Sequence, residues 1–334
     1  MRPMDIEFII AAPAGLEAEA VRQVPLLDSA YARGAVQAGT ADAQSFWFDL
    51  VGVARQQDWP AAPWRLDAQT AGDAYWLCAD PVHLRLDRNQ LLLDTGAAVT
   101  LDHAGASALV GTLNAHFAAD GLAFHAITPG QWVLRVPRPL DLATTPPRQA
   151  AGRPAALTQP TGIDAPWARR LANEAQMVLH QADLNAAREA ARQAPLNSLW
   201  LWGGGTRAGA VATLPQSLAV ASPATHVREL ARAAGAEILT PGADWATTLP
   251  LLHQTRASKA LIDLTEIPAD GDWAPTLEQG WLNPAQATAG AGKLRFWSTL
   301  LSRGGNFKTR LYHRDLFHFF RRKSLAHYID KRQN

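Results

Sequence analysis

The sequence has 334 residues, of which 48% are hydrophobic and 18% are charged. This balance excludes an intrinsically disordered chain, and the length leaves room for two compact units. The 31 basic and 30 acidic side chains nearly cancel, which excludes the positive field of a general nucleic-acid binder. A single cysteine, Cys78, excludes a disulfide framework and a cysteine-based zinc site. The only apolar run near the start, 8–12, is too short for a signal peptide or membrane span, so we expect a cytoplasmic protein without membrane contact.

Residues 1–74 contain short apolar runs separated by Pro, Gly and Ala, and their pattern alone predicts no elements. From Tyr75 the pattern sharpens. Residues 81–87 alternate between apolar and polar side chains, which predicts a half-buried strand, and 91–93 predict a second one. A helix is expected from about Ala104 to Gly121, followed by strands over 123–126 and 131–136. The order β-β-α-β-β predicts a small α+β subdomain over 75–136.

Prolines are frequent between 137 and 165, and this composition predicts a linker or a long surface loop there. After it, residues 166–334 alternate between expected helices and strands, which is typical of an α/β domain with a mostly parallel sheet. The expected strands cover 198–202, 218–221, 237–239 and 260–264, and the expected helices begin at Asp164, Thr225 and Trp245. A C-terminal hairpin is predicted around 302–306, and a basic helix capped by Asp315 after it.

The first candidate site is the apolar strand from Asn197 that runs into three glycines. Bare backbone amides in such a loop can bind an anion, and strand ends are common ligand sites in α/β sheets. A purely structural turn is the competing interpretation, because the sequence has neither a Gly-Lys-Ser/Thr motif nor a GxGxxG motif there. The candidate residues are Asn197, Gly203, Gly204 and Gly205.

The second candidate site is the polar face of the strand over 81–87. His83 and Arg85 lie on that face, and Arg135 of a neighbouring expected strand could join them. An Arg beside a His can bind a phosphate or carboxylate and leave the imidazole for proton transfer. The alternative is an ordinary solvated face of an antiparallel sheet.

Metal ligands do not cluster in the sequence. Asp80 and His83 are three residues apart on an expected strand, so they point to opposite faces and cannot share an ion. The sequence contains neither an HxH nor an HExxH motif, and we expect no metal and no cofactor.

The C-terminal segment is strongly basic. From Arg303 onward, nine Lys and Arg stand against two Asp, a net charge of +7. The triplet Arg321, Arg322 and Lys323 could bind an acidic protein partner, whereas Phe317 and Phe320 would anchor the expected helix on the body.

A resemblance to known proteins rests on the runs 197–205, 76–88 and 315–322 and on Asn185 and Arg188. These segments are similar to those of the RpfE-type regulatory proteins of proteobacteria, often labelled phosphoglycerate mutase-like. Through that family the chain distantly resembles the archaeal-type cofactor-independent phosphoglycerate mutases. The resemblance implies an alkaline-phosphatase-like α/β fold that begins within 1–74 and carries an inserted α+β subdomain over 75–136.

The sequence also departs from those mutases. Their first strand ends in a metal-binding Asp, but here Ala11 and Ala12 follow it, and Ala182 stands where a His is expected. A late cluster of Asp and His ligands is also missing from the sequence. Without two metal ions, a phosphoryl transfer would lose several kcal/mol of charge stabilisation. The sequence therefore favours a non-catalytic, metal-free regulatory or binding module that could retain a site for a phosphorylated small molecule. The alternative is a mutase-like or phosphate-ester enzyme with an unusual site.

Overall fold

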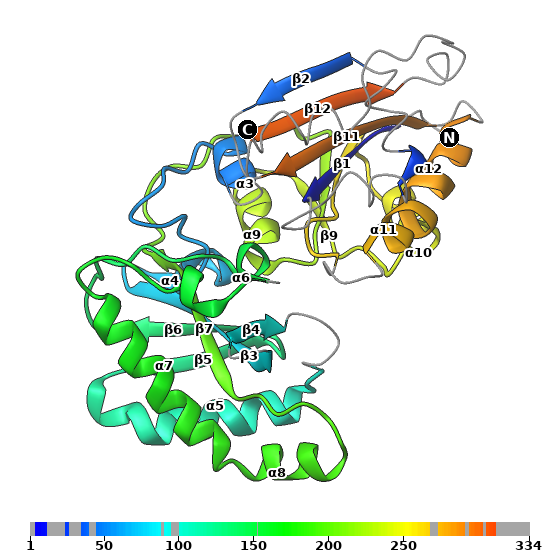
Figure 1. Cartoon of the computed structure of the whole chain (residues 1–334). Coiled ribbons are helices and arrows are strands. Elements are labelled where there is room, and N and C mark those ends of the chain that lie inside the picture. The colour runs from blue at the N-terminus through cyan, green and yellow to red at the C-terminus, as the bar shows by residue number, and fades with distance from the viewer. Residues whose placement is uncertain are drawn as a thin grey trace. The chain divides into compact units, whose positions relative to one another are not determined.

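The computed structural model describes residues 4–11, 24–26, 35–39, 45–87, 90–94, 100–151, 153–267, 273–290, 294–302 and 305–311. They divide into two compact units, each with its own sheet (Figure 1). Unit 1 comprises Met1–Val53 and Val211–Asn334, and unit 2 comprises Ala54–Ala210. Among the described helices, none has the length and apolar character needed to cross a bilayer.

Unit 1 contains a mixed sheet with β1 near its centre (Figure 1). In the part of the chain that the structure describes, it has seven strands in the order β2-β12-β11-β1-β10-β8-β9. β1 pairs in parallel with β10 and β11, whereas β12 is antiparallel to β11 and to β2. The strands are β1 (Met4–Ala11), β2 (Ala35–Gly39), β8 (Leu218–Ala221), β9 (Glu237–Leu239), β10 (Lys259–Asp263), β11 (Leu294–Ser302) and β12 (Gly305–Leu311).

The core of unit 1 forms where the apolar side chains of β1 meet helices from the second half of the chain. Ile6, Phe8 and Ile10 are fully buried, and Phe8 packs edge-on against Trp245 of α10. α10 begins at a capping box in which Asp244 and Thr247 satisfy each other's backbone amides. The helical segments of this unit are α3 (Ser45–Leu50), α9 (Thr225–Ala233), α10 (Trp245–His253), α11 (Trp273–Pro275), the π-helix η5 (Thr276–Leu282) and α12 (Asn283–Gly290).

Unit 2 is organised around one long antiparallel strand, β3. Successive stretches of β3 pair with β6, β7 and β4, and β5 pairs with β6. The strands are β3 (Tyr75–Asp87), β4 (Gln90–Asp94), β5 (Ala123–Thr128), β6 (Gln131–Val136) and β7 (Ser198–Gly205). The first half of β3 is buried, but Leu86 near its end is exposed, because that end extends beyond the core. The strand expected over 81–87 is therefore not half-buried along its whole length.

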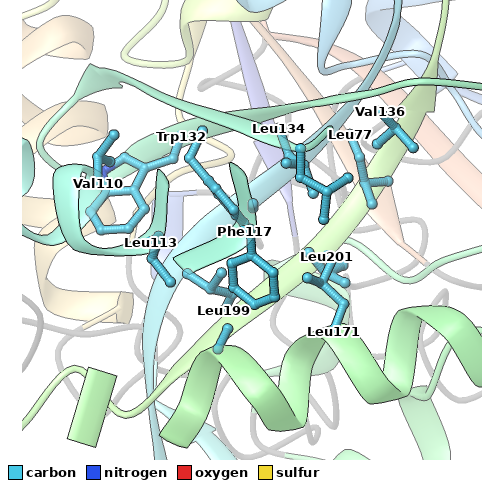
Figure 2. Packing of buried hydrophobic residues seen from close by; sticks show 14 of the residues in the cluster. Leu77, Val110, Leu113, Phe117, Trp132, Leu134, Val136, Leu171, Leu199 and Leu201 are labelled. Atoms are coloured by element: carbon cyan, nitrogen blue, oxygen red, sulfur yellow. The ribbon is translucent and has the colours of Figure 1, made fainter. Parts of the chain in front are cut away.

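One face of this sheet packs against the helices α5 and α7 (Figure 2). Leu113 and Phe117 of α5, and Leu171 of α7, meet Trp132 and Leu199 of the sheet in a single cluster. The helical segments of the unit are η1 (Pro63–Arg65), α4 (Ala68–Ala71), α5 (His103–Phe117), η3 (Ala118–Asp120), α6 (Pro147–Ala150), η4 (Ala155–Thr158), α7 (Ala165–His180) and α8 (Asp183–Ala190). The expected helix stop at Gly121 is present, since Gly121 adopts a φ of +69°.

The opposite face of the same sheet contains a buried ion pair. Arg65 of η1 donates to both carboxylate oxygens of Asp80 on β3, at 2.5 and 2.9 Å. The Asp80 carboxylate also accepts from the Trp132 amide at 2.9 Å and from the Trp202 indole at 2.8 Å. Four donors therefore compensate one buried carboxylate, as burial of a charge requires.

The division into units corrects the boundaries expected from the sequence. β7 pairs with β3 and not with the parallel sheet, so residues up to Ala210 belong to unit 2. The segment 137–165 also lies within unit 2, because Leu140 and Leu142 are buried in its core. The composition of that segment indicated irregular structure, but only packing shows that it does not join two domains. The coarse expectation of a mixed α/β protein with a largely parallel sheet and a smaller, separate antiparallel layer agrees with the structure.

Asp58 provides a prediction about pH. It is buried and accepts hydrogen bonds from the amide and hydroxyl of Thr144. Burial nevertheless raises the pKa of Asp58 above its usual value. The folded state therefore holds this proton over a pH range in which the unfolded state has released it, and stability falls as pH rises through that range. The variant Asp58→Asn lacks this pH-dependent contribution to the free energy of unfolding, because its side chain does not titrate.

The measurement is the free energy of unfolding from pH 3 to pH 8 for the wild type and for Asp58→Asn. We expect the wild type to lose stability relative to the variant as pH rises above about 4. A difference that stays constant or grows in favour of the wild type would contradict a raised pKa.

Candidate functional site

The three glycines of the first candidate site form the end of β7 and are buried. The Gly203 amide donates to the Thr144 hydroxyl at 3.1 Å, and its carbonyl accepts from the Ala62 amide at 2.9 Å. A Cβ on Gly204 would lie 2.5 Å from the Tyr75 hydroxyl, and one on Gly205 would lie 2.6 Å from Pro60 Cβ. The glycines thus allow neighbouring segments to approach the strand closely. Anion binding by their amides stays a prediction.

Asn197 lies just before β7, and its side chain is bound to backbone. Its Oδ1 accepts from the Leu84 amide at 2.7 Å, and its Nδ2 donates to the Leu84 carbonyl at 3.0 Å. The side chain therefore continues the pairing of β3 beyond the end of β7. Asn185 does the same for Leu196.

The structure does not bring His83, Arg85 and Arg135 together. Arg135 pairs with Trp76, seven residues before His83 on β3, which is about 23 Å along a strand. Because Trp76 and His83 are an odd number of residues apart on β3, their side chains point to opposite faces of the sheet. Arg135 shares the face of its partner Trp76, so it lies on the face opposite to His83. His83 Nδ1 lies 2.8 Å from the Pro195 carbonyl, and Arg85 is exposed. His83 therefore contacts the backbone of the segment before β7, and an anion-binding role for it stays a prediction.

The carboxyl ends of β8 and β10 in unit 1 contain a buried polar cluster that the sequence did not reveal. The Ser222 hydroxyl donates to Asp263 Oδ2 at 2.6 Å, and the Thr265 hydroxyl donates to Asp263 Oδ1 at 2.6 Å. Thr265 adds its amide at 3.0 Å, while Ser222 accepts from the Ala224 amide at 3.1 Å. Such strand ends commonly bind ligands in α/β proteins. Here these side chains bind one another and connect the two strands.

Two further expectations concern metals and the basic segment. Over the described ranges, no group of three or more His, Cys, Asp and Glu is arranged to hold a metal ion. Arg321, Arg322 and Lys323 lie outside the described residues, as does the expected cap Asp315.

A cavity of about 310 Å³ lies within unit 2, between the end of α5, the end of β6 and the first turns of α7. Its apolar lining is continuous with the unit 2 core: Phe117, Val136 and Leu171 belong to the cluster shown in Figure 2. Trp167, Arg170, Leu171 and Glu174 share one side of α7 because they follow the helical spacing i, i+3, i+4, i+7. That spacing was a signal in the sequence. Its apolar members, Trp167 and Leu171, mark the buried side of the helix, whereas its charged members carry no such signal.

Two of the four charged side chains that line the cavity are paired. Arg138 binds Asp164 in a bidentate pair, at 2.6 and 3.0 Å, and this holds the pKa of Asp164 below its usual value. Asp164 also accepts from the Asp141 amide at 2.8 Å, so the pair connects the segment after β6 to the start of α7. Glu174 Oε1 lies 2.7 Å from His116 Nε2 on α5. Both pairs are protein contacts that require no ligand.

The other two charged side chains are Arg170 and Asp120. Both are exposed, and neither has a hydrogen bond or an ion pair to any residue that the structure describes. The guanidinium of Arg170 is a planar donor that fits a carboxylate or a phosphate. The cavity therefore combines a buried apolar floor with one available cation and one available anion.

Comparison with known proteins shows only distant structural similarity. No family model and no curated protein matches the sequence. The cofactor-independent phosphoglycerate mutase from Thermoplasma acidophilum is 13% identical, covers 93% of this chain and 90% of its own, and has a TM-score of 0.42. The PH0037 protein from Pyrococcus horikoshii is 14% identical, covers 93% of this chain and 88% of its own, and has a TM-score of 0.47. The resemblance to RpfE-type proteins stays a prediction.

Proposed function

We propose that this chain is a binding or regulatory module that recognises a small organic anion in the unit 2 cavity. The observation that carries the proposal is the Arg170 guanidinium, which has no partner among the described residues and stands beside a buried apolar floor. The floor would bury the body of the ligand, and the guanidinium would bind its anionic group by charge-assisted hydrogen bonds.

The state of the buried polar groups supports a non-catalytic role. Ser222 is fully buried, and its hydroxyl both donates to Asp263 and accepts from the Ala224 amide. A serine nucleophile needs access to substrate and a base free to take its proton. Asp263 accepts from two hydroxyls and one amide, so its oxygens are occupied by the protein itself.

The proposal places the anion at a different site from the candidates predicted from the sequence. His83, Arg85 and Arg135 do not converge, and the glycine amides lie in a packed strand, whereas Arg170 is available. A phosphorylated small molecule belongs to the class of anions that the proposal includes. Binding of an acidic protein partner by Arg321, Arg322 and Lys323 stays a separate prediction.

Substitution of Arg170 tests the proposal. The probes are benzoate, 3-phenylpropionate, inorganic phosphate and phosphoglycerate, and the readout is the Kd from isothermal titration. We expect at least one probe to bind with a Kd near or below about 1 mM, as small ligands do. Arg170→Gln should weaken that binding about tenfold or more, because it removes a charge-assisted hydrogen bond.

Arg169→Gln is the matched control. Arg169 precedes Arg170 on α7, is exposed and does not line the cavity, so this variant loses the same charge without changing the site. Equal weakening in both variants would indicate a general charge effect. Failure of every probe to bind, or binding unchanged in Arg170→Gln, would refute the proposed function.

A further inference from the structure

We propose that the ligand of the unit 2 cavity is a zwitterion with an apolar body, of the chemical class of α-amino acids with apolar or aromatic side chains. This inference rests on the proposed function and deepens it. It starts from the charges that line the cavity, which are Arg138, Arg170, Asp120 and Glu174.

The protein itself pairs two of these charges. Arg138 binds Asp164, and Glu174 contacts His116, so each has a partner before any ligand enters. Arg170 and Asp120 are the two lining charges without such a partner in the described part of the chain, and their signs are opposite. A ligand that carries one anionic and one cationic group can pair both. A simple anion pairs only Arg170 and leaves Asp120 as a source of repulsion.

The two charges come from different elements. Asp120 ends η3, which follows α5, whereas Arg170 lies on α7. A ligand that contacts both side chains therefore presents its ammonium and carboxylate groups to two different elements, with its apolar body on the floor beside them. The ammonium group would face Asp120 and the carboxylate would face Arg170.

The carboxylates of the cavity disfavour a phosphate ester. A phosphate monoester carries close to two negative charges at neutral pH, and Asp120 and Glu174 both line the cavity. Like charges brought together in a partly desolvated site repel each other. A zwitterion adds no net charge, and each of its groups meets an opposite one.

The apolar floor sets the size of the body. It is formed by Phe117, Leu122, Val136, Leu140 and Leu171, which are buried, and by the partly buried Trp167. A volume of about 310 Å³ lies at the small end of ligand pockets. It suits one amino-acid-sized molecule better than a nucleotide. The partly buried ring of Trp167 favours an aromatic or branched aliphatic body.

The experiment compares three probes that share one body: L-phenylalanine carries both charges, 3-phenylpropionate carries only the carboxylate, and 2-phenylethylamine carries only the ammonium. Kd values are measured by isothermal titration on the full chain. We expect L-phenylalanine to bind the wild type at least about fivefold more tightly than either single-charge probe, in line with one added charge pair.

Two variants assign the groups. Asp120→Asn should remove the preference for L-phenylalanine over 3-phenylpropionate and leave the Kd of 3-phenylpropionate unchanged or lower. Arg170→Gln should weaken both carboxylate probes and leave 2-phenylethylamine unchanged. Asp73→Asn is the matched acidic control, because Asp73 is an exposed carboxylate of the same unit that does not line the cavity. All three substitutions are at exposed positions, and far-UV circular dichroism verifies folding.

The outcomes separate the two proposals. Equal binding of L-phenylalanine and 3-phenylpropionate, with both weakened by Arg170→Gln, would overturn the zwitterion and support the anion site. Tighter binding of phosphate or phosphoglycerate than of L-phenylalanine would also overturn the zwitterion. Binding of L-phenylalanine that Arg170→Gln does not weaken would overturn both proposals.

Discussion

Asp80→Asn is expected to lower the free energy of unfolding of unit 2 by about 3 to 5 kcal/mol, because it leaves the Arg65 guanidinium buried without a counter-charge. In either orientation the NH₂ group of the Asn side chain also faces two of the present donors, which are Arg65 and the Trp202 indole or Arg65 and the Trp132 amide. The readouts are urea unfolding and hydrogen exchange of the amides of β3 and β7, which should lose protection.

Two further variants define the origin of the effect. Arg232→Gln removes a cation from the exposed pair with Glu229 on α9 and should cost less than about 1 kcal/mol. The double variant Arg65→Met with Asp80→Leu leaves no unpaired charge and should recover part of the lost stability. The recovery should be incomplete, because the Trp132 amide and the Trp202 indole lose their acceptor. A cost below about 1 kcal/mol for Asp80→Asn would show that the pair is not buried in solution.

Gly204→Ala is the second variant with a large expected effect. The added Cβ would lie 2.5 Å from the Tyr75 hydroxyl and 3.0 Å from Leu77 Cδ1, and both side chains are buried. Such overpacking costs about 1 to 3 kcal/mol. The free energy of unfolding should fall by that amount, measured by the same urea titration.

A second substitution tests whether the hydroxyl is the cause. The Tyr75 hydroxyl is buried and has no hydrogen-bond partner in the described part of the chain, and burial raises the pKa of Tyr75 well above its usual value. Tyr75→Phe alone should therefore be close to neutral, and in the Gly204→Ala background it should restore part of the lost stability. Absence of any rescue would show that another contact opposes the new Cβ.

Gly111→Ala supplies the matched control. Gly111 is exposed on α5, and a Cβ there would meet no atom within 4 Å. Since alanine is the better helix former, this variant should gain about 0.5 to 1 kcal/mol. A loss of unfolding free energy in Gly204→Ala together with a gain in Gly111→Ala would show that Gly204 is required for packing. It would also show that the surroundings of Gly204 differ from those of an open loop.

The sequence by itself determined most elements with a clear period. The apolar positions of α5 and α7 follow the helical spacing, and β8 and α10 lie where the pattern predicted them. The C-terminal hairpin is present as β11 and β12. These elements could be predicted because their signals are local: a buried face repeats every few residues, and caps and glycine turns mark its ends.

Only the tertiary structure decided which elements pair and which side chains meet. β7 has the apolar composition of a strand in a parallel sheet, yet it pairs antiparallel with β3, and Asp80 meets Trp202 across 122 positions of sequence. Asn197 and His83 were chosen as candidate site residues for their chemistry, but backbone groups more than 100 positions away bind them. The cavity unites Asp120 and Arg170 through the packing of α7 beside the end of α5. Local sequence patterns do not predict such long-range contacts. A polar side chain is compatible with a solvated surface position wherever it stands in the sequence, so its type alone does not identify its partner.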